Sequence, residues 1–454
     1  MQTTPIETVA RQRWLIVGGG MMGLTLAKLL AERGQSVTVA EAAPTFGGLA
    51  SAWTVGDVTW DRFYHVTLLS DARLRGILRE LDLEHEIRWV TSKTGFYTGG
   101  KLYSLSSSWE FLRFPPLNLV EKLRLGATIL RASKIKNWRP LEHIPVDKWL
   151  RRWSGRTTFE KIWLPLLRAK LGDAYVHTSA AFIWAYISRM YRARRSGMKT
   201  EMFGYVPGGY ARVLDAFTSR LRSMGVELMP SAAVQQISRD EKAGCQARFR
   251  DGRTLHFDNV ISTLPSPAIS ESCAQLSPDD HSRLKAISYI GVVCASLVLD
   301  KPLASYYVTN ITDSWVPMTA VIEMSTIVQA NQFGGKSLVY LPKYLPAHDP
   351  GLDDPEDVIL DRFLAAIERM YPHFSRSSVT ASRVARAKFV MAIPTLGYSD
   401  NLPPVVTSVP SFYALNSAHI TEGTLNVNET IELAERKLHS DVWPDFLRRT
   451  QLVG

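Results

Sequence analysis

The order of apolar and polar segments at the start of the chain is typical of an α/β fold. An apolar run at 14–17 is followed by glycines, an amphipathic stretch at 22–33 and a second apolar run at 36–40. This order predicts strand, loop, helix and strand, which together open a doubly wound parallel sheet. Later short apolar runs predict further strands, namely 226–229, 233–237, 259–264 and 412–415.

The middle of the chain changes pattern twice. Aromatic residues on both sides of Gly99-Gly100 predict a tight hairpin, with which a small sheet begins. From 109 to about 195 the pattern is helical, with a capping signature at Asn118-x-x-Glu121. The apolar positions that follow this signature have helical spacing, and they are Val120, Leu123, Ala127 and Leu130.

After residue 288 the apolar alternation predicts a second, mixed sheet, interrupted by a loop over 342–357, and a helix closes the chain at 428–438. We therefore expect an α/β protein with a discontinuous Rossmann-type domain and a substrate domain of mixed sheet plus helices. The expected cofactor domain comprises 1–70, 203–286 and 406–454. Residues 71–202 would form a hairpin and a basic helical substrate region, and 287–405 the substrate-domain sheet.

The composition limits the cellular compartment and the kinds of structural site that we expect for this chain. The chain has 454 residues and three cysteines, whose spacing fits neither a disulfide framework nor a metal-binding or redox CxxC pair. The apolar stretch at 14–30 is broken by glycines, and the one at 287–299 is too short for a span of roughly 20 residues. We expect a cytoplasmic protein without a structural metal or a spanning helix.

Positive charge is concentrated in one region. The net charge is +10, but between Glu121 and Lys199 there are 18 Lys and Arg against 5 Asp and Glu. Such a stretch can be a solvated helical face, or it can bind an anionic substrate or an anionic membrane surface. Nucleic acid ranks last, because no known binding module is recognisable. The apolar segment 111–117 beside these cations predicts peripheral membrane contact through 105–200, on the cytoplasmic face, and a lipid-like or isoprenoid substrate.

Gly18-x-Gly20-x-x-Gly23 stands between the first predicted strand and helix. Gly18 permits the tight turn, Gly20 lets the backbone approach a pyrophosphate, and Gly23 lets helix and strand pack closely. Met22 lies at the helix N-terminus, whose N–H groups and dipole favour phosphate. This arrangement predicts a dinucleotide site.

The residues downstream favour FAD over other dinucleotides. Glu41 follows Gly23 by 18 residues, where a carboxylate can accept a ribose hydroxyl, and the next residue, Ala42, offers no positive charge to a 2′-phosphate. Gly47-Gly48-Leu49 provides a second close backbone approach, which suits a longer cofactor.

With these motifs the chain resembles the amine-oxidase-like flavoproteins, a group that includes monoamine and polyamine oxidases, protoporphyrinogen oxidase, phytoene-type desaturases and UDP-galactopyranose mutase. Further matching segments are 204–210, the strand around Val234, 260–263, 394–398, and the regions of Asn416 and Asn428. The resemblance implies hydride transfer between a substrate carbon and flavin N5. It also implies adenine contact at Val234 and cofactor contacts at Asn416 and Asn428.

For catalysis the resemblance points to three residues. Segment 61–66 matches the segment laid along the flavin, which makes His65 flavin-proximal, and Tyr398 lies in the matching 394–398 motif. The flavin-facing lysine of the oxidases has two candidates, Lys343 and Lys388, of which we assign Lys388 together with His65 and Tyr398.

The sequence also departs from the family pattern. Asn416-Ser417 replaces a Gly-Asp pair, and Glu429 stands where a small residue is common. Three functions stay open at this point: an FAD-dependent oxidoreductase acting on a C–N or C–C bond of an amine, isoprenoid or lipid-like substrate; a redox-neutral flavin mutase acting on a diphosphate-bearing substrate; and a non-catalytic flavin protein of the membrane surface.

Overall fold

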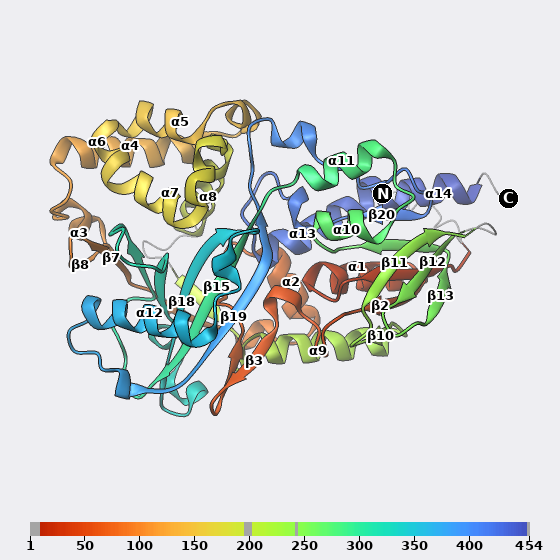
Figure 1. Cartoon of the computed structure of the whole chain (residues 1–454), viewed down its shortest axis with the longest axis horizontal. Coiled ribbons are helices and arrows are strands. Elements are labelled where there is room, and N and C mark those ends of the chain that lie inside the picture. The colour runs from red at the N-terminus through yellow and green to blue at the C-terminus, as the bar shows by residue number, and fades with distance from the viewer. Residues whose placement is uncertain (1–9, 195–201, 241–243, 452–454) are drawn as a thin grey trace.

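The computed structural model describes residues 10–194, 202–240 and 244–451. Lys199, at the end of the basic stretch, lies outside these residues. A five-stranded parallel sheet in the order β10-β2-β1-β14-β20 forms the predicted doubly wound unit (Figure 1). Its strands are β1 (Arg13–Val17), β2 (Ser36–Ala40), β10 (Glu227–Met229), β14 (Asn259–Ser262) and β20 (Phe412–Ala414). The fold class expected from the sequence is confirmed.

Both faces of this sheet are covered, so its central strands β1 and β14 are buried along most or all of their length. One face packs against helices that belong to one large core: α1 (Met21–Glu32), α2 (Ala72–Glu80), α9 (Gly209–Ser223), α13 (Val427–Lys437) and α14 (Trp443–Gln451). The other face carries a small antiparallel sheet and two helices: β11 (Val234–Arg239), β12 (Cys245–Phe249), β13 (Thr254–Phe257), α10 (Ser266–Ser272) and α11 (Pro278–Ala286). Segments from three parts of the chain thus build one cofactor unit.

A seven-stranded mixed sheet forms the second unit, in the order β19-β15-β18-β17-β16-β7-β8. Its strands are β7 (Thr94–Thr98), β8 (Lys101–Ser104), β15 (Tyr289–Leu299), β16 (Val308–Ile311), β17 (Ala320–Glu323), β18 (Ser337–Pro346) and β19 (Val379–Ala392). Strand β15 is buried along its whole length, which explains its uninterrupted apolar run.

Two details of this sheet differ from the sequence prediction. The β7–β8 hairpin is not a separate small sheet, because β7 pairs in parallel with β16. The predicted loop over 342–357 starts too early, because β18 stays paired with β15 through Pro342 to Pro346. The remainder of that segment leads into α12 (Glu356–Met370), which covers one face of the sheet. Sequence-distant pairing of this kind leaves no local signal.

The basic region is helical, as expected, and forms one end of the molecule (Figure 1). It contains α3 (Ser108–Leu112), α4 (Leu119–Lys134), α5 (Val146–Ser154), α6 (Arg156–Thr158), α7 (Leu164–Leu171) and α8 (Ala180–Arg194). The capping box at the start of α4 is present, with Glu121 N donating to Asn118 Oδ1 at 2.9 Å. Most of the aromatic residues here form a core, including Trp138, Trp149 and Trp163.

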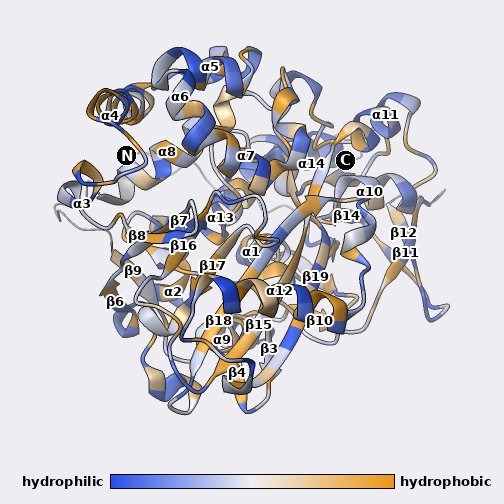
Figure 2. Cartoon of the chain, turned by 60° about the vertical axis from the view of Figure 1, so that its left-hand side comes forward, coloured by the Kyte–Doolittle hydropathy of each residue, from blue (hydrophilic) through white to orange (hydrophobic). Residues whose placement is uncertain are grey.

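Helix α4 turns the predicted apolar face outward. Val120, Leu123, Ala127 and Leu130 are exposed, whereas Leu125 and Ala132 pack into the helical core. Figure 2 shows α3 and α4 at the periphery of this region. Apolar periodicity therefore identified the helix correctly but not the face that packs inward. Within the described residues, no helix combines the length and the apolar character needed to cross a membrane.

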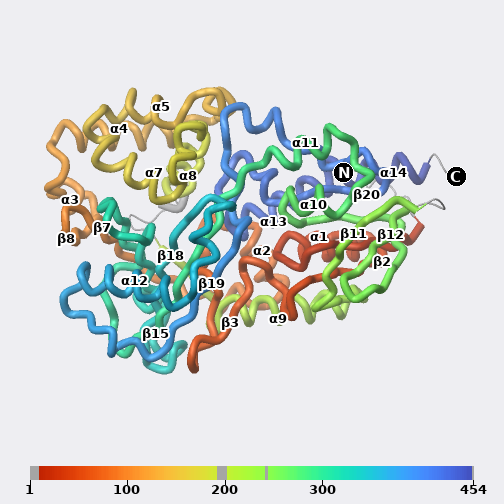
Figure 3. The backbone as a smooth tube through the Cα atoms, in the orientation of Figure 1, coloured from red at the N-terminus to blue at the C-terminus, as the bar shows by residue number. Residues whose placement is uncertain are grey.

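Two smaller sheets connect the units. Strands β3 (Ala52–Val55) and β4 (Val58–Asp61) form a hairpin, and β5 (Thr67–Leu68), β9 (Met202–Tyr205) and β6 (Arg88–Thr91) form a three-stranded sheet. Figure 3 shows the hairpin segment β3 beside β19, although about 330 residues separate them along the chain. The cofactor unit and the mixed sheet therefore meet along this line.

Candidate active site

Two glycine turns meet at the carboxyl end of the parallel sheet. Gly18 has φ +104°, and a Cβ added at Gly23 would lie 1.9 Å from Gly18 O, so both positions require glycine. Gly47 N donates to Gly19 O at 2.8 Å, and Gly20 pairs with Gly47 as an isolated bridge. A Cβ at Gly20 would meet only backbone atoms at 3.9 Å or more. The turns thus leave open space at the N-terminus of α1.

Glu41 closes this cradle at the end of β2. Its Oε2 accepts a hydrogen bond from Gly19 N at 2.7 Å, and its Oε1 accepts one from Ala43 N at 2.8 Å. These bonds fix the carboxylate beside the first glycine turn, and each carboxylate oxygen can accept a further hydrogen bond. The position matches that of a ribose-binding acidic residue in dinucleotide-binding folds.

The cradle is one end of a cavity of about 560 Å³, within the range of small-molecule and cofactor sites. Nine of the predicted cofactor residues line it: Gly18, Gly20, Met22, Glu41, Gly47, Gly48, Leu49, Asn416 and Asn428. The other three predicted cofactor residues, Gly23, Ala42 and Val234, are not among the described residues that line this cavity. Gly23 packs against Gly18 instead, and Val234 begins β11 of the small sheet. The residues present fit a dinucleotide along this cavity.

The two asparagines support the walls of the cavity. Asn416 Nδ2 donates to Leu264 O at 2.8 Å, and Asn416 Oδ1 accepts from Ala418 N at 2.9 Å. Asn428 Oδ1 accepts hydrogen bonds from Arg73 N and Leu74 N, in the first turn of α2. Both side chains therefore already bond to the protein, and Asn416 holds the turn in which Ser417, not the family's usual acid, lines the cavity.

His65 lies in the cavity wall, with its Nδ1 2.8 Å from Phe63 O and 3.8 Å from Asp61 Oδ2. Burial lowers the pKa of His65 to about 4, so the ring is neutral near pH 7. Burial raises the pKa of Asp61 to about 7, although a hydrogen bond from Tyr210 N at 2.7 Å opposes the shift. His65 is therefore a neutral imidazole near pH 7 and can take part in hydrogen bonds at the cavity wall without carrying a charge.

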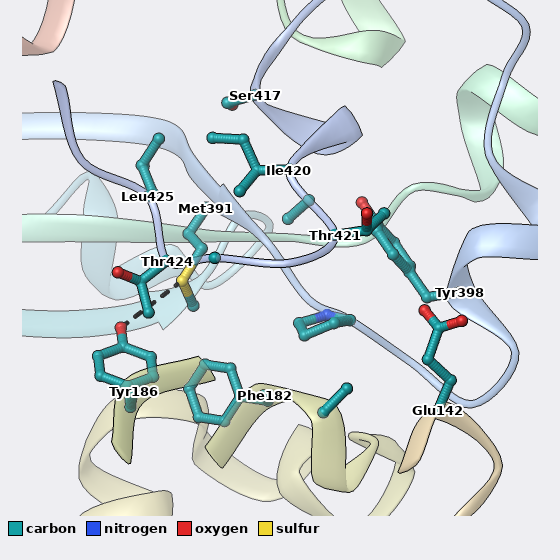
Figure 4. A pocket seen from close by; sticks show the side chains of 14 residues that line it. Glu142, Phe182, Tyr186, Met391, Tyr398, Ser417, Ile420, Thr421, Thr424 and Leu425 are labelled. Atoms are coloured by element: carbon teal, nitrogen blue, oxygen red, sulfur yellow. Dashed lines mark hydrogen bonds between the residues drawn. The ribbon is translucent and has the colours of Figure 1, made fainter. Parts of the chain in front are cut away.

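The structure does not bring the other two predicted catalytic residues to this cavity. Tyr398 lines a smaller, adjoining cavity of about 30 Å³ (Figure 4). Its hydroxyl donates to Ala418 O at 2.8 Å. Lys388 is half-exposed and pairs with Asp353 at 2.9 Å. The register of β19 against β15 shifts at this point, so that residues 388–390 have no paired partner on β15, and the two residues after Lys388, Phe389 and Val390, line the large cavity instead.

The lysine that does line the cavity is Lys170, near the end of α7. Its Nζ lies 3.2 Å from the ring centroid of Tyr344, and the Tyr344 hydroxyl bonds that of Tyr64 at 2.8 Å. Burial lowers the pKa of Lys170 to about 7. Sequence reasoning missed Lys170 because it stands in a helical region without a motif, among many other cations.

A second cation at the cavity, Arg189 of α8, is neutralised. It lies 3.2 Å from Asp71, the residue before α2, and 3.8 Å from Glu429, in the first turn of α13. Glu429, which departs from the family pattern, thus meets a positive charge supplied by the helical region. Burial raises the pKa of Asp71, while the charge of Arg189 opposes that shift.

This combination of a doubly wound sheet, two glycine turns, a ribose-binding acid and one long cavity defines an FAD-dependent oxidoreductase. Residues 21–430 match the model of the flavin containing amine oxidoreductases, and the chain belongs to that family. The 15-cis-phytoene desaturase of Synechococcus elongatus is 22% identical over 437 residues, covering 88% of this chain and 90% of the relative.

Solved structures share the fold. A protoporphyrinogen oxidase-like protein from Exiguobacterium sp. 255-15 superposes with a TM-score of 0.75 at 18% identity, covering 95% of this chain and 99% of that one. A reduced UDP-galactopyranose mutase superposes with a TM-score of 0.72 at 14% identity, covering 95% of this chain and 94% of the mutase chain. At these identities the mutase shares the architecture only, whereas family membership makes the chain an enzyme and not a purely structural flavin protein.

The cradle generates a prediction about cofactor affinity. Replacing Glu41 by alanine removes the carboxylate beside Gly19, and we expect FAD to bind about tenfold to a hundredfold more weakly, because a charge-assisted hydrogen bond contributes about 1.5–3 kcal/mol. Titration of apoprotein with FAD, followed by flavin fluorescence, measures this change.

The matched control is Glu32→Ala. Glu32 pairs with Lys28 at the partly exposed end of α1, and Lys28 keeps a second partner in Glu80. We expect unchanged FAD affinity in this variant. Equal affinities in the Glu41 and Glu32 variants would show that the ribose end of the site is misplaced.

Proposed function

We propose that this enzyme uses FAD to oxidise or reduce a C–C bond of an isoprenoid or other lipid-like substrate, which binds at the Lys170 end of the cavity. The proposal rests mainly on one observation: Lys170 and the glycine cradle line the same continuous cavity. When bound, FAD supplies the two-electron redox chemistry. The chain supplies the enclosure, the orientation of the substrate and the groups that hold protons.

The lining of the substrate end supports an apolar substrate. Aromatic and aliphatic side chains dominate it, and they come from the segment after β4, from the helical region and from the mixed sheet and its connections: Tyr64, Tyr186, Val292, Tyr307, Tyr344, Phe389 and Val390. Such walls bury apolar surface, and apolar surface is what an isoprenoid or lipid offers. The likeness to a phytoene desaturase along nearly the whole chain points in the same direction.

Lys170 argues against an amine as substrate. Among the described residues no ion pair engages its ammonium group, whose nearest aromatic partner is the Tyr344 ring. Below about pH 7, where Lys170 is protonated, a protonated amine entering this end of the cavity would meet a like charge in a region of low dielectric. A neutral or anionic substrate would not meet such repulsion. Among the substrate classes that the sequence left open, the isoprenoid or lipid-like class is therefore favoured over the amines.

The helical region offers a surface for reaching such a substrate. Six apolar side chains of α3 and α4 are between 46% and 64% exposed: Trp109, Leu112, Leu119, Val120, Leu123 and Leu130. Arg113 lies over Trp109, and α4 also carries Arg124, Arg131 and Lys134. Exposed apolar groups with cations on the same helices suit the interface of an anionic bilayer. We propose that this patch docks the enzyme on a membrane.

Lys170 generates a prediction about pH. Its amine is protonated below about pH 7 and neutral above it, so we expect the rate of anaerobic flavin reduction by substrate to change with a midpoint near pH 7. Lys170→Met should abolish that transition. The measurement is stopped-flow bleaching of the flavin band, after a screen of polyprenyl, amine and nucleotide-sugar candidates.

Lys388→Met is the control, because Lys388 pairs with Asp353 outside the cavity. Its profile should match that of the wild type. A profile that is identical in all three proteins would remove Lys170 from the mechanism. Reduction by amines alone would contradict the lipid-like substrate, and turnover only after prior chemical reduction would favour the mutase reaction.

The surface patch generates a second prediction. The triple change Leu119→Ser, Val120→Ser and Leu123→Ser should abolish cosedimentation with vesicles containing phosphatidylglycerol and leave FAD content unchanged. Binding of the wild type should weaken as salt rises, since screening acts on the flanking cations. Val358→Ser, at an exposed apolar position on α12, is the control. If the triple variant sediments like the wild type, the patch does not contact membranes.

A further inference from the structure

A second depression lies beside the cavity. It is lined by residues of the β3 segment and of β19, two segments that Figure 3 shows side by side. It is an open groove of about 790 Å³, and three arginines line it: Arg62, Arg383 and Arg386. Gly48 and Leu49 line both the groove and the large cavity. A molecule in the groove would therefore lie next to the cofactor site, on the other side of this glycine turn.

The arginines are held close together although their charges repel. Arg62 and Arg383 both lie against the ring of Trp53, at 5.9 Å and 4.5 Å from its centroid. Burial lowers the pKa of Arg62, and the positive charge of Arg383 lowers it further. Like charges placed this close cost free energy unless an anion lies near them.

None of the three arginines forms an ion pair with a carboxylate of the described residues. The guanidinium groups of Arg62, Arg383 and Arg386 donate to backbone oxygens of residues 386, 54 and 354. The Nε atoms of Arg62 and Arg386 are buried without an acceptor. A guanidinium group without a carboxylate partner is stabilised by a nearby anion, so a negatively charged ligand in the groove would stabilise this cluster.

The nearby acids are occupied elsewhere. Asp353 pairs with Lys388 at 2.9 Å, and Asp354 pairs with Arg362 at 3.2 Å. Glu356 lines the groove, but its Oε1 accepts from Val384 N at 2.8 Å. Glu41, at the far edge of the groove, is bonded to the glycine turn. The groove lining therefore keeps an excess of positive charge, with three arginines against Glu41 and Glu356.

We propose that this groove binds a small molecule bearing a diphosphate, separate from the FAD itself. Arginine forks match the several acceptor oxygens of phosphate groups, and three of them suit a doubly or triply charged anion better than a single carboxylate. The diphosphate of FAD has its own place at the glycine turn and the N-terminus of α1. The groove thus provides a second anion site at the edge of the cofactor site.

The test uses FAD-loaded protein and inorganic pyrophosphate as the probe, with binding measured by isothermal titration calorimetry. The wild type should bind pyrophosphate saturably, and more weakly as salt rises. The double variant Arg62→Gln with Arg383→Gln should bind it at least about tenfold more weakly, with unchanged FAD content. Arg222→Gln, at an exposed arginine on α9, should bind like the wild type.

Arg383→Gln alone serves if the double variant does not fold, because the Arg383 side chain is exposed and its removal disturbs little of the core. It should still weaken pyrophosphate binding several-fold. Three outcomes would overturn the proposal: no saturable binding by the wild type, equal binding by the wild type and these variants, or loss of FAD from the variants, which would assign the arginines to the diphosphate of the cofactor.

Discussion

The active site depends on the close contact between two backbone turns that carry no side chains. Gly47 N donates a hydrogen bond to Gly19 O. Gly48 lies so close to Gly20 that a Cβ added at Gly48 would be 3.1 Å from Gly20 Cα. This contact fixes the direction in which the N-terminus of α1 opens and sets the start of the β3–β4 hairpin. Through that hairpin it also sets where the mixed sheet docks, since Arg62, after β4, bonds to Arg386 O on β19.

A buried carboxyl group holds the same junction from the other side. Asp61 accepts from Tyr210 N at the start of α9, and its backbone oxygen accepts from the Tyr340 hydroxyl on β18. One residue thus ties the cofactor unit to the mixed sheet. The burial that makes this contact possible also shifts the pKa values of Asp61, His65 and Lys170. The proton chemistry of the cavity is therefore a consequence of how the units close around it.

The sequence predicted the features that are encoded locally. A strand, a glycine turn and a helix follow one another over 13–32, so the cradle and Glu41 were readable from spacing alone. Contacts between distant segments were not readable. Lys170 reaches the cavity only because α7 packs on β18, and Lys388 misses it because β19 shifts its register there and presents Phe389 and Val390 to the cavity. The outward apolar face of α4 likewise depends on which side its neighbours cover.

The central claim is that the long cavity holds FAD without a covalent bond and exposes it to substrate. The most direct measurement is the absorbance spectrum of the purified protein, recorded before and after denaturation and again with an anaerobic polyprenyl substrate. The account predicts close to one FAD per chain, released into solution on denaturation and bleached by substrate in the folded protein. A colourless protein that gains no flavin spectrum when FAD is added would contradict it.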